Sequence, residues 1–418
     1  MTLAPRPDLA FGVYIHFPFC LHRCPYCDFN LRVVREIPHE AYAEAVLAEL
    51  EARWRRFEGR RLVSIYFGGG TPGLWEAACI ARVIEAIRQR WPLLADPADV
   101  ALAEAEGGDP IEVTVEINPR AAARPLLDAL AQAGVNRLSV GIQSFDEATL
   151  GRLGRDHDAA RALETMRDAR EAGWRRLSFD LLFGGPGHTT DIFAEDLRQA
   201  AALDWADHVS AYSLIVEEAT RFGKLKAGGK LKEADEAEVV EMLKMCEAGL
   251  GEAGWRRYEI SSYSRPGREA RHNSLYWVGG ETMGLGVGAH ELAIAPDGVA
   301  LRREGALRTR DYLRDPVGSA RAEERIEAPL HLAERLYLGL RTRYGVSVEQ
   351  LRGQFGAAAA QGAAQKLAAL EDQGYAERSN AQEGGPAYLW AEGERFVPTA
   401  RGMLFADDVA MEVLPDEA

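Results

Sequence analysis

From residue 11 to residue 215, short apolar segments alternate with longer segments in which apolar residues recur every three or four positions. The short segments have the length and the Val, Ile and Phe content of buried strands, and the longer ones have the periodicity of amphipathic helices. We predict strands over residues 12–16, 62–67, 112–117, 137–142, 177–183 and 208–215. Between them we predict helices over residues 39–57, 75–91, 125–133, 159–172 and 192–203.

Strand–helix repeats of this kind pair their strands in parallel, because each helix carries the chain back to the edge where the previous strand began. We therefore expect an α/β fold that begins with a partial (β/α)6 barrel, which we assign to residues 1–225. Ligand sites in such folds lie at the carboxyl ends of the strands. The residues that follow each predicted strand are thus the first place to look for chemistry.

The rhythm changes after the sixth predicted strand. The Gly- and Lys-containing stretch at residues 223–230 is typical of an exposed connector, and a helix over 233–250 and a strand over 258–263 follow. We expect an α+β extension over residues 226–325.

The last part of the chain, residues 326–418, is mainly helical in pattern. After a first helix from about residue 328, helices are predicted over 348–355 and 357–372, a hairpin over 375–378 and 387–397, and a last helix over 400–413. Helices with one hairpin indicate a winged-helix-like module. Such modules often bind DNA, but the net charge of the chain, −15, favours a structural or ligand-covering role.

Composition narrows the function classes further. The net charge argues against a protein that grips nucleic acid through its phosphates. The chain has no run of about 18 apolar residues, and its first residues lack the pattern of a secretory signal, so we expect neither an integral membrane protein nor an exported one. With five cysteines in 418 residues, a reducing cytosol is the expected location.

Three of the five cysteines, Cys20, Cys24 and Cys27, fall within eight positions directly after the first predicted strand. Three thiolates on one loop can each bind one iron of a [4Fe–4S] cluster and leave the fourth iron open to a small molecule. A zinc site with His16 or His22 as fourth ligand is an alternative, and a disulfide that leaves one odd thiol is another.

Polar and glycine residues also interrupt the ends of the following strands. Gly69, Gly70 and Thr71 follow the second strand, where consecutive glycines let a backbone edge approach a ligand closely. Glu116, Gln143 and Asp180 lie near the carboxyl ends of the third, fourth and fifth strands. A polar residue in a buried strand needs a hydrogen-bond partner, which a ligand could supply.

The cysteine loop resembles the cluster motif of radical S-adenosylmethionine (SAM) proteins, with Tyr14 upstream of it and Tyr26 between its last two cysteines. This resemblance implies a [4Fe–4S] cluster that binds SAM through its open iron, and a glycine loop that pairs with the amino end of SAM's methionine. Positions that bind SAM in the coproporphyrinogen-dehydrogenase branch of the family are matched by Glu116, Gln143, Arg155 and Asp180, with Arg152 as the competing assignment for Arg155.

A second informative stretch runs from residue 271 to residue 290. It holds His272, the adjacent aromatic residues Tyr276 and Trp277, and a glycine-rich run, which together offer an axial ligand, stacking surfaces and a closely approaching backbone. Taken alone, such a histidine is more often a hydrogen-bonded structural residue. The segment is similar to the H-N-x-x-Y-W motif of the heme-chaperone (HemW) branch of the family, which implies a role for His272 in binding heme.

The residue two positions after the last cluster cysteine separates the two branches. Oxygen-independent coproporphyrinogen dehydrogenases resemble this chain but carry a fourth cysteine there, and this chain has Phe29. The resemblance therefore implies a cytosolic heme chaperone that binds heme and passes it to acceptor proteins, such as respiratory enzymes at the inner membrane, where it would be a peripheral protein.

The alternative is the coproporphyrinogen III dehydrogenase itself, which decarboxylates two propionates of its substrate. Porphyrin propionates would need arginine partners, for which Arg155 and the region of Arg341 are candidates, although neither is distinctive. A third reading, a purely structural cluster in a scaffold protein, is disfavoured by the glycine loop and the polar strand ends.

Overall fold

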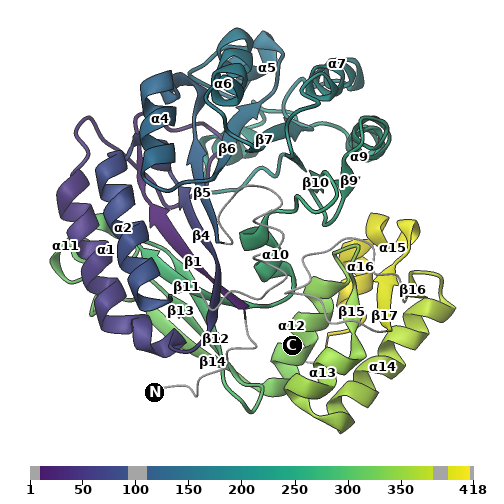
Figure 1. Ribbon diagram of the computed structural model, residues 1–418. Coiled ribbons are helices and arrows are strands. Elements are labelled where there is room, and N and C mark those ends of the chain that lie inside the picture. Colours follow the sequence, from purple (N-terminus) through teal and green to yellow (C-terminus); the bar gives the residue numbers. More distant parts are fainter. Residues whose placement is uncertain (1–9, 93–110, 380–393, 415–418) are drawn as a thin grey trace.

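The computed structural model describes residues 10–92, 111–379 and 394–414. Its centre is a twelve-stranded sheet in which neighbouring parallel strands form the partial barrel (Figure 1). All the strands predicted for the barrel are present, and the last ends at Ser213 instead of residue 215. In order across the sheet they are β1 (Ala10–Phe17), β4 (Arg61–Gly69), β5 (Glu112–Ile117), β6 (Arg137–Gln143), β7 (Arg176–Phe183) and β8 (His208–Ser213).

The helices between these strands cover the outer face of the barrel (Figure 1). The predicted helices are confirmed, although the first gives way to a 3-10 turn at Trp54–Phe57. They are α1 (His39–Arg53), α2 (Ala77–Arg90), α4 (Arg124–Gln132), α6 (Ala159–Glu171) and α7 (Thr190–Ala201), with the short α5 (Glu147–Arg152) before α6.

The two faces of the barrel strands differ in chemistry. On β1, Phe11, Val13 and Ile15 are fully buried in the main hydrophobic core, against the outer helices. The alternate positions point into the barrel, where Tyr14 stacks on Tyr66 with ring centroids 6.1 Å apart. Inward positions on the other strands are also polar, so the interior of this barrel is suited to ligands and hydrogen bonds.

The glycine-rich run after Trp277 is a strand that the sequence pattern did not reveal. β11 (Glu281–Gly286) pairs in parallel with β1 and extends the sheet beyond the barrel. Gly286 has φ +97°, and a Cβ there would lie 2.5 Å from the carbonyl oxygen of His16. The glycine is therefore needed for packing against β1. The edge continues through β12 (His290–Ile294), β13 (Ala300–Glu304) and β14 (Ala322–Ile326), with α11 (Thr309–Arg314) between the last two.

Two predictions for the middle of the chain were wrong in detail. The stretch expected to be an exposed connector contains α8 (Arg221–Ala227), which begins after Thr220 because the Thr220 side chain accepts a hydrogen bond from the Gly223 amide. The strand expected over residues 258–263 is a pair of short strands, β9 (Arg256–Arg257) and β10 (Ser262–Ser264), at the β8 edge of the sheet. The predicted helix between them and α8 is confirmed as α9 (Glu236–Glu252).

The C-terminal part has a hydrophobic cluster of its own, which includes Leu336, Leu367, Phe396 and Val409. The last predicted helix is broken at Phe405, and residues 387–393 of the predicted hairpin lie outside the described residues. The winged-helix-like character and the domain boundaries stay predictions; the boundary at residue 225 falls within α8. The elements are α12 (Ala328–Gly339), β15 (Val346–Ser347), α13 (Val348–Phe355), α14 (Ala357–Asp372), β16 (Ala376–Ser379), β17 (Arg395–Pro398), α15 (Ala400–Leu404) and α16 (Ala406–Met411).

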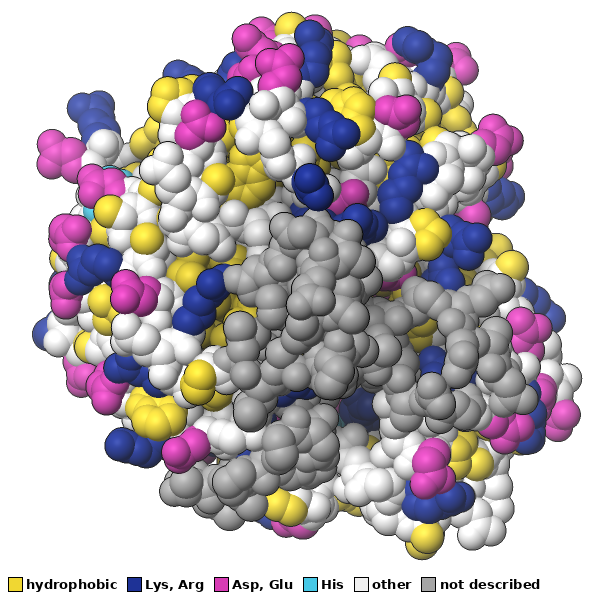
Figure 2. Space-filling model, viewed as in Figure 1, with side chains coloured by type: hydrophobic (Ala, Val, Ile, Leu, Met, Phe, Trp, Pro, Cys, Tyr) yellow, Lys and Arg dark blue, Asp and Glu magenta, His cyan; other side chains and the backbone are white. Residues whose placement is uncertain are grey.

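The outer surface carries charges of both signs. In the view of Figure 2, acidic and basic side chains alternate over the helices that surround the barrel. Among the described helices, none combines the length and the apolar composition needed to cross a bilayer.

A buried ion pair joins the barrel to the added strands. Arg60, directly before β4, donates from Nε to Oε2 of Glu281 on β11 at 2.9 Å, and both side chains are almost completely buried. We expect Arg60→Leu to lower the free energy of unfolding by about 3–5 kcal/mol, because it leaves a carboxylate buried without its cation. Urea unfolding followed by circular dichroism measures this. Arg82→Leu is the control, because Arg82 pairs with Glu40 on the surface; equal, small changes in both variants would contradict the prediction.

Candidate functional site

The cysteine loop leaves the barrel at the carboxyl end of β1. Cys20 ends the short strand β2 (Phe19–Cys20), which pairs with β3 (Arg32–Val33), and Cys24 and Cys27 lie in the turn between them. The Cys27 amide donates to the Cys24 carbonyl at 3.1 Å, so these two cysteines belong to one tight turn. The structure thus brings together the three cysteines that the sequence singled out.

Two further segments contact the cysteine sulfurs. The Cys20 sulfur lies 3.3 Å from the Thr71 hydroxyl, and the Cys24 sulfur accepts a hydrogen bond from the Arg155 guanidinium at 3.4 Å. The glycine loop after β4 and the segment after α5 therefore meet at the cysteine loop.

The donor set fits an iron–sulfur cluster better than a single metal ion. Sulfur ligands of one zinc ion lie about 4 Å apart, whereas a four-iron cube with one cysteine per iron holds them farther apart. In the described part of the chain, the three ligand atoms found within 4.8 Å of one another belong to Glu40, Glu76 and Cys79, and not to the cysteine loop. Burial raises the pKa of the Cys27 thiol to about 11, so a metal must displace its proton.

The glycine loop is held by backbone hydrogen bonds. The amides of Gly70 and Thr71 donate to the carbonyls of Phe17 and Phe19 at 2.8 and 3.0 Å. A Cβ at Gly70 would lie 2.7 Å from the Phe19 carbonyl oxygen, and Gly69 has φ +111°. The packing of the loop therefore requires both glycines whether or not a ligand is bound.

Two carboxyl groups face the interior, Glu116 near the end of β5 and Asp180 in the middle of β7. Glu116 accepts hydrogen bonds from the Tyr66 hydroxyl at 2.7 Å and from the Gly69 amide at 3.2 Å. Burial raises the pKa of Glu116 to about 7, and the hydrogen bond from Tyr66 opposes the shift. Burial likewise raises the pKa of Asp180 to about 6. A cationic ligand beside either carboxyl group would favour its ionised form.

Gln143 at the end of β6 has a strained backbone. Its φ of 74° makes it the one non-glycine residue with positive φ among the described residues, and the pairing of β6 with β7 shifts register just before it. Its side-chain carbonyl accepts a hydrogen bond from the Tyr212 hydroxyl at 3.0 Å. Strain of this kind gathers at functional sites, where the surroundings hold it in place.

Arg155, and not Arg152, reaches the cysteine loop. Besides its contact with Cys24, Arg155 donates to the carbonyl of Gly141 at 2.9 Å, while its Nε is buried without a partner. Arg152 instead donates to the Thr149 hydroxyl within α5. A shallow, open hollow of about 520 Å³ lies beside Arg155 and is lined by Arg120, Arg155, Asp156, His157, Asp158 and Arg161.

The two predicted tyrosines lie in different surroundings. The Tyr14 hydroxyl lies 3.0 Å from Nδ1 of His16 in the barrel interior, and its ring also stacks on His272. Tyr26 lies on the cysteine loop against Phe222, with ring centroids 6.4 Å apart. Tyr26 is thus at the mouth of the site and Tyr14 is deeper.

His272 lies inside the barrel on α10 (Arg271–Trp277). It is buried, its Nδ1 lies 2.9 Å from the Ser64 hydroxyl, and its Nε2 lies 3.0 Å from the Tyr276 hydroxyl. Its ring stacks on Tyr66 at 5.1 Å. Burial lowers the pKa of His272 to about 3, so the ring is neutral. Both ring nitrogens have partners in this conformation.

Sequence reasoning missed Tyr66 and Tyr212, whose hydroxyls position Glu116 and Gln143. Each occupies an inward position on its strand, where Tyr66 pairs in register with Tyr14 of β1 and Tyr212 pairs with Leu182 of β7. The alternation of inward and outward positions could have identified both tyrosines once one inward residue per strand was known.

The family model of the radical SAM superfamily matches residues 14–200, and that of the HemN C-terminal domain matches residues 327–382. The cysteine loop, the glycine loop and the polar strand ends all fall within the first match. In radical SAM proteins this region implies a [4Fe–4S] cluster and SAM.

Curated relatives cover most of the chain. The heme chaperone HemW of Escherichia coli is 34% identical over 72% of this chain and 75% of its own length, and that of Lactococcus lactis is 32% identical over 82% and 85%. The radical S-adenosyl methionine domain-containing protein 1, mitochondrial, of Bos taurus is 34% identical over 87% of this chain and 81% of its own.

A solved structure extends the likeness to the fold. Coproporphyrinogen III oxidase (HemN) from Escherichia coli, described as a radical SAM enzyme, matches with a TM-score of 0.75 over 98% of this chain and 91% of its own, at 22% identity. At this identity the match shows the fold alone, and the family assignment rests on the curated relatives. The chain belongs to the HemW-like family of radical SAM proteins.

Proposed function

We propose that this protein is a heme chaperone that binds heme and transfers it to acceptor proteins, such as respiratory enzymes at the membrane. The observation that carries the proposal is the 34% identity to a protein named heme chaperone HemW, which extends over three quarters of that protein's length. Phe29, in place of a fourth cysteine, supports the chaperone over the coproporphyrinogen dehydrogenase. The Phe29 side chain is 56% exposed, so no packing demand of the core explains an aromatic residue there.

Cys20, Cys24 and Cys27 are the proposed ligands of the cluster. SAM is proposed to lie between the cluster, the glycine loop with Gly69, Gly70 and Thr71, and the strand ends. The side chains proposed to contact it are Tyr14, Tyr26, Glu116, Gln143, Arg155 and Asp180. When bound, a reduced cluster supplies one-electron reduction of SAM. The residues of this chain supply cationic partners for the thiolates and carboxylates for the ammonium and sulfonium charges of SAM.

His272 remains the residue proposed to bind the heme iron, on condition that its Nε2 loses its present hydrogen-bond partner. Its Nε2 can bind iron only after the Tyr276 hydroxyl has left it. Tyr276 is 43% exposed, so its side chain has room to turn toward solvent. Nδ1 would keep its bond to Ser64, as the second nitrogen of a metal-binding histidine generally does.

The chaperone and the dehydrogenase give different results in one comparison. We expect anaerobically reconstituted protein to bind heme in about one-to-one ratio, seen as a shifted Soret band. With coproporphyrinogen III, SAM and a reductant, we expect no protoporphyrinogen by chromatography. Decarboxylation over many turnovers would show that the protein is the dehydrogenase and not the chaperone. A lack of heme binding would refute the proposal.

Two substitutions test the role of His272. We expect His272→Ala to weaken heme binding about tenfold or more and to change the Soret band. Tyr276→Phe removes the hydroxyl that competes for Nε2, so it is expected to bind heme at least as tightly as the wild type. Titrations followed by absorbance measure both. If His272→Ala lowers the melting temperature and leaves the heme spectrum unchanged, His272 is a structural residue.

The raised pKa of Glu116 predicts a pH dependence of SAM binding. A cationic ligand needs the ionised carboxylate, which is lost as pH falls through about 7. We therefore expect the Kd for SAM to rise about tenfold between pH 8 and pH 6. Calorimetric titrations are expected to show weaker binding and a flattened pH profile for Glu116→Gln, and a normal profile for Glu164→Gln on the surface of α6. An unchanged profile in Glu116→Gln removes Glu116 from the SAM site.

The cysteine assignment is tested by metal content. We expect Cys24→Ser to lose the brown absorbance and most of the iron after reconstitution, while its circular dichroism stays that of a folded protein. Cys246→Ser is the matched control, because Cys246 is buried within α9, away from the loop. Normal iron content in Cys24→Ser would contradict the assignment, and zinc in place of iron in the wild type would favour a zinc site.

A further inference from the structure

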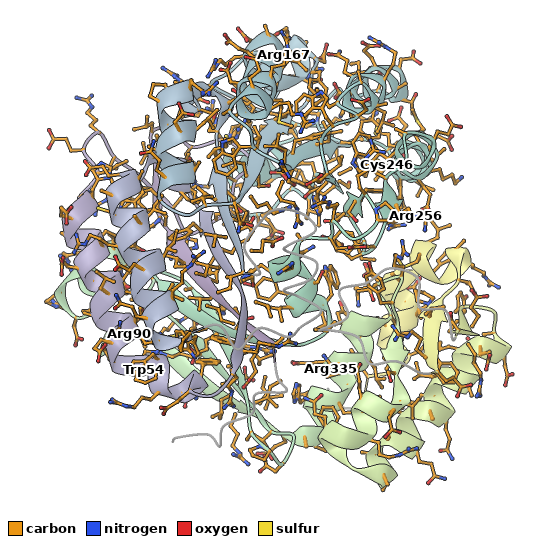
Figure 3. All side chains as sticks on the ribbon, viewed as in Figure 1. Trp54, Arg90, Arg167, Cys246, Arg256 and Arg335 are labelled. Atoms are coloured by element: carbon orange, nitrogen blue, oxygen red, sulfur yellow. The ribbon has the colours of Figure 1, made fainter. Side chains whose placement is uncertain are left out.

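A small cavity lies between α10 and the C-terminal elements. Its volume is about 10 Å³, room for one oxygen atom and not for a whole ligand. Arg335, from the middle of α12, lines it; Figure 3 labels this residue beside α12. The other lining residues are Trp277, Val278, Gly339, Gly345, Val346, Ser347, Gln350 and Leu351.

Arg335 reaches this cavity without a partner. In the described part of the chain no carboxylate pairs with its guanidinium, and its Nε is enclosed with no hydrogen-bond acceptor. Burial alone lowers the pKa of Arg335 to about 10, with no nearby charge to offset it. An arginine in such surroundings is unusual, because taking an unpaired cation out of water costs free energy.

Trp277 adds a second donor to the same cavity. Its indole Nε1 is also buried without an acceptor, although the residue as a whole is partly exposed, as Arg335 is. The Ser347 hydroxyl accepts a hydrogen bond from the Gln350 amide at the start of α13, and its own O–H remains able to donate. Two residues whose buried donors have no acceptor, one of them an arginine, therefore line a space that fits a single oxygen atom.

The turn after α10 fixes the arginine side chain. Gly279 has φ +58°, and a Cβ there would lie 2.5 Å from Cδ of Arg335. The aliphatic stem of Arg335 therefore packs directly on Gly279, which holds the guanidinium at the Trp277 end of α10. A side chain at residue 279 would displace it.

The arginines that the sequence offered for propionates are already engaged. Arg341 pairs with Asp407 and stacks on Tyr337, with its guanidinium carbon 3.5 Å from the ring centroid. Arg155 donates to Cys24 and Gly141. Arg335 lies within α12, six residues before Arg341, and is the one of these three without a partner in the described structure.

We propose that Arg335 and the Trp277 indole form a carboxylate site that binds a propionate group of the heme. This inference rests on the proposed function and deepens it. The cavity accepts one oxygen while the body of the ligand stays outside, which suits an acid group on a short arm. Trp277 belongs to the same short helix as His272, so a tetrapyrrole over α10 would place an edge near Arg335.

The test compares heme with its dimethyl ester, which lacks both carboxylates, in titrations of the full-length protein with the same cosolvent. We expect Arg335→Gln to weaken heme binding about ten- to a hundredfold, as the loss of one charged hydrogen bond requires. The ester is expected to bind wild type and Arg335→Gln equally. Arg352→Gln, an exposed arginine of α13 paired with Glu349, removes the same charge and is expected to change nothing. Equal heme affinity in wild type and Arg335→Gln overturns the site.

A second readout does not depend on heme. If Arg335 is held unpaired for a ligand, Arg335→Leu is expected to raise the melting temperature of the ligand-free protein, because it removes a desolvated charge. A lower melting temperature would make Arg335 structural and overturn the proposal. If wild type binds no heme at all, the proposed function fails. In that case acetate tests the site alone: a rise in melting temperature with acetate in wild type but not in Arg335→Gln retains a carboxylate site, and its absence removes it.

Discussion

Two backbone hydrogen bonds, from Gly70 and Thr71 to Phe17 and Phe19, hold the site together. They clamp the loop after β4 onto the segment that leads into Cys20, so the cysteine loop and the glycine loop cannot shift independently. Through Thr71 the clamp reaches a cysteine sulfur, and the neighbouring Gly69 amide reaches Glu116. Any cofactor bound between these loops and the strand ends therefore meets surroundings whose geometry is set by β1 and β4, before the cofactor arrives.

The site could be predicted from sequence where position along the chain implies position in space. Carboxyl ends of parallel strands meet at one edge, so Cys20, Glu116 and Gln143 could be assigned together without knowing their contacts. The strand β11 could not, because glycines are poor strand formers and the close approach of Gly286 to β1 outweighs that preference. Nor could Arg335, since the lack of a partner is a property of the folded surroundings and leaves no mark on the local pattern.

The interior of the barrel drives its ionisable groups toward neutrality. Burial raises the pKa values of Glu116 and Asp180 and lowers that of His272. Each shift avoids the cost of a charge in a poorly hydrated space, so the barrel interior tolerates many polar groups. A cationic ligand favours the ionised form of both carboxyl groups. Because Glu116 must release its proton near neutral pH, part of the binding free energy of such a ligand is used to deprotonate it. The same burial keeps His272 unprotonated, which is the state a metal ligand requires.

The short helix α10 explains why its motif is difficult to interpret from sequence. His272 faces the barrel interior, and Asn273 donates to Tyr258 and Glu259, which lie next to the start of β10. Both residues are thus fully used by the fold, as is the Tyr276 hydroxyl. Trp277 differs, because it lines a small cavity and its buried indole N–H has no acceptor among the described residues. The heme contacts that we propose for α10 therefore differ in what they require: the Trp277 end has a donor without an acceptor, and the His272 end becomes available only when Tyr276 moves.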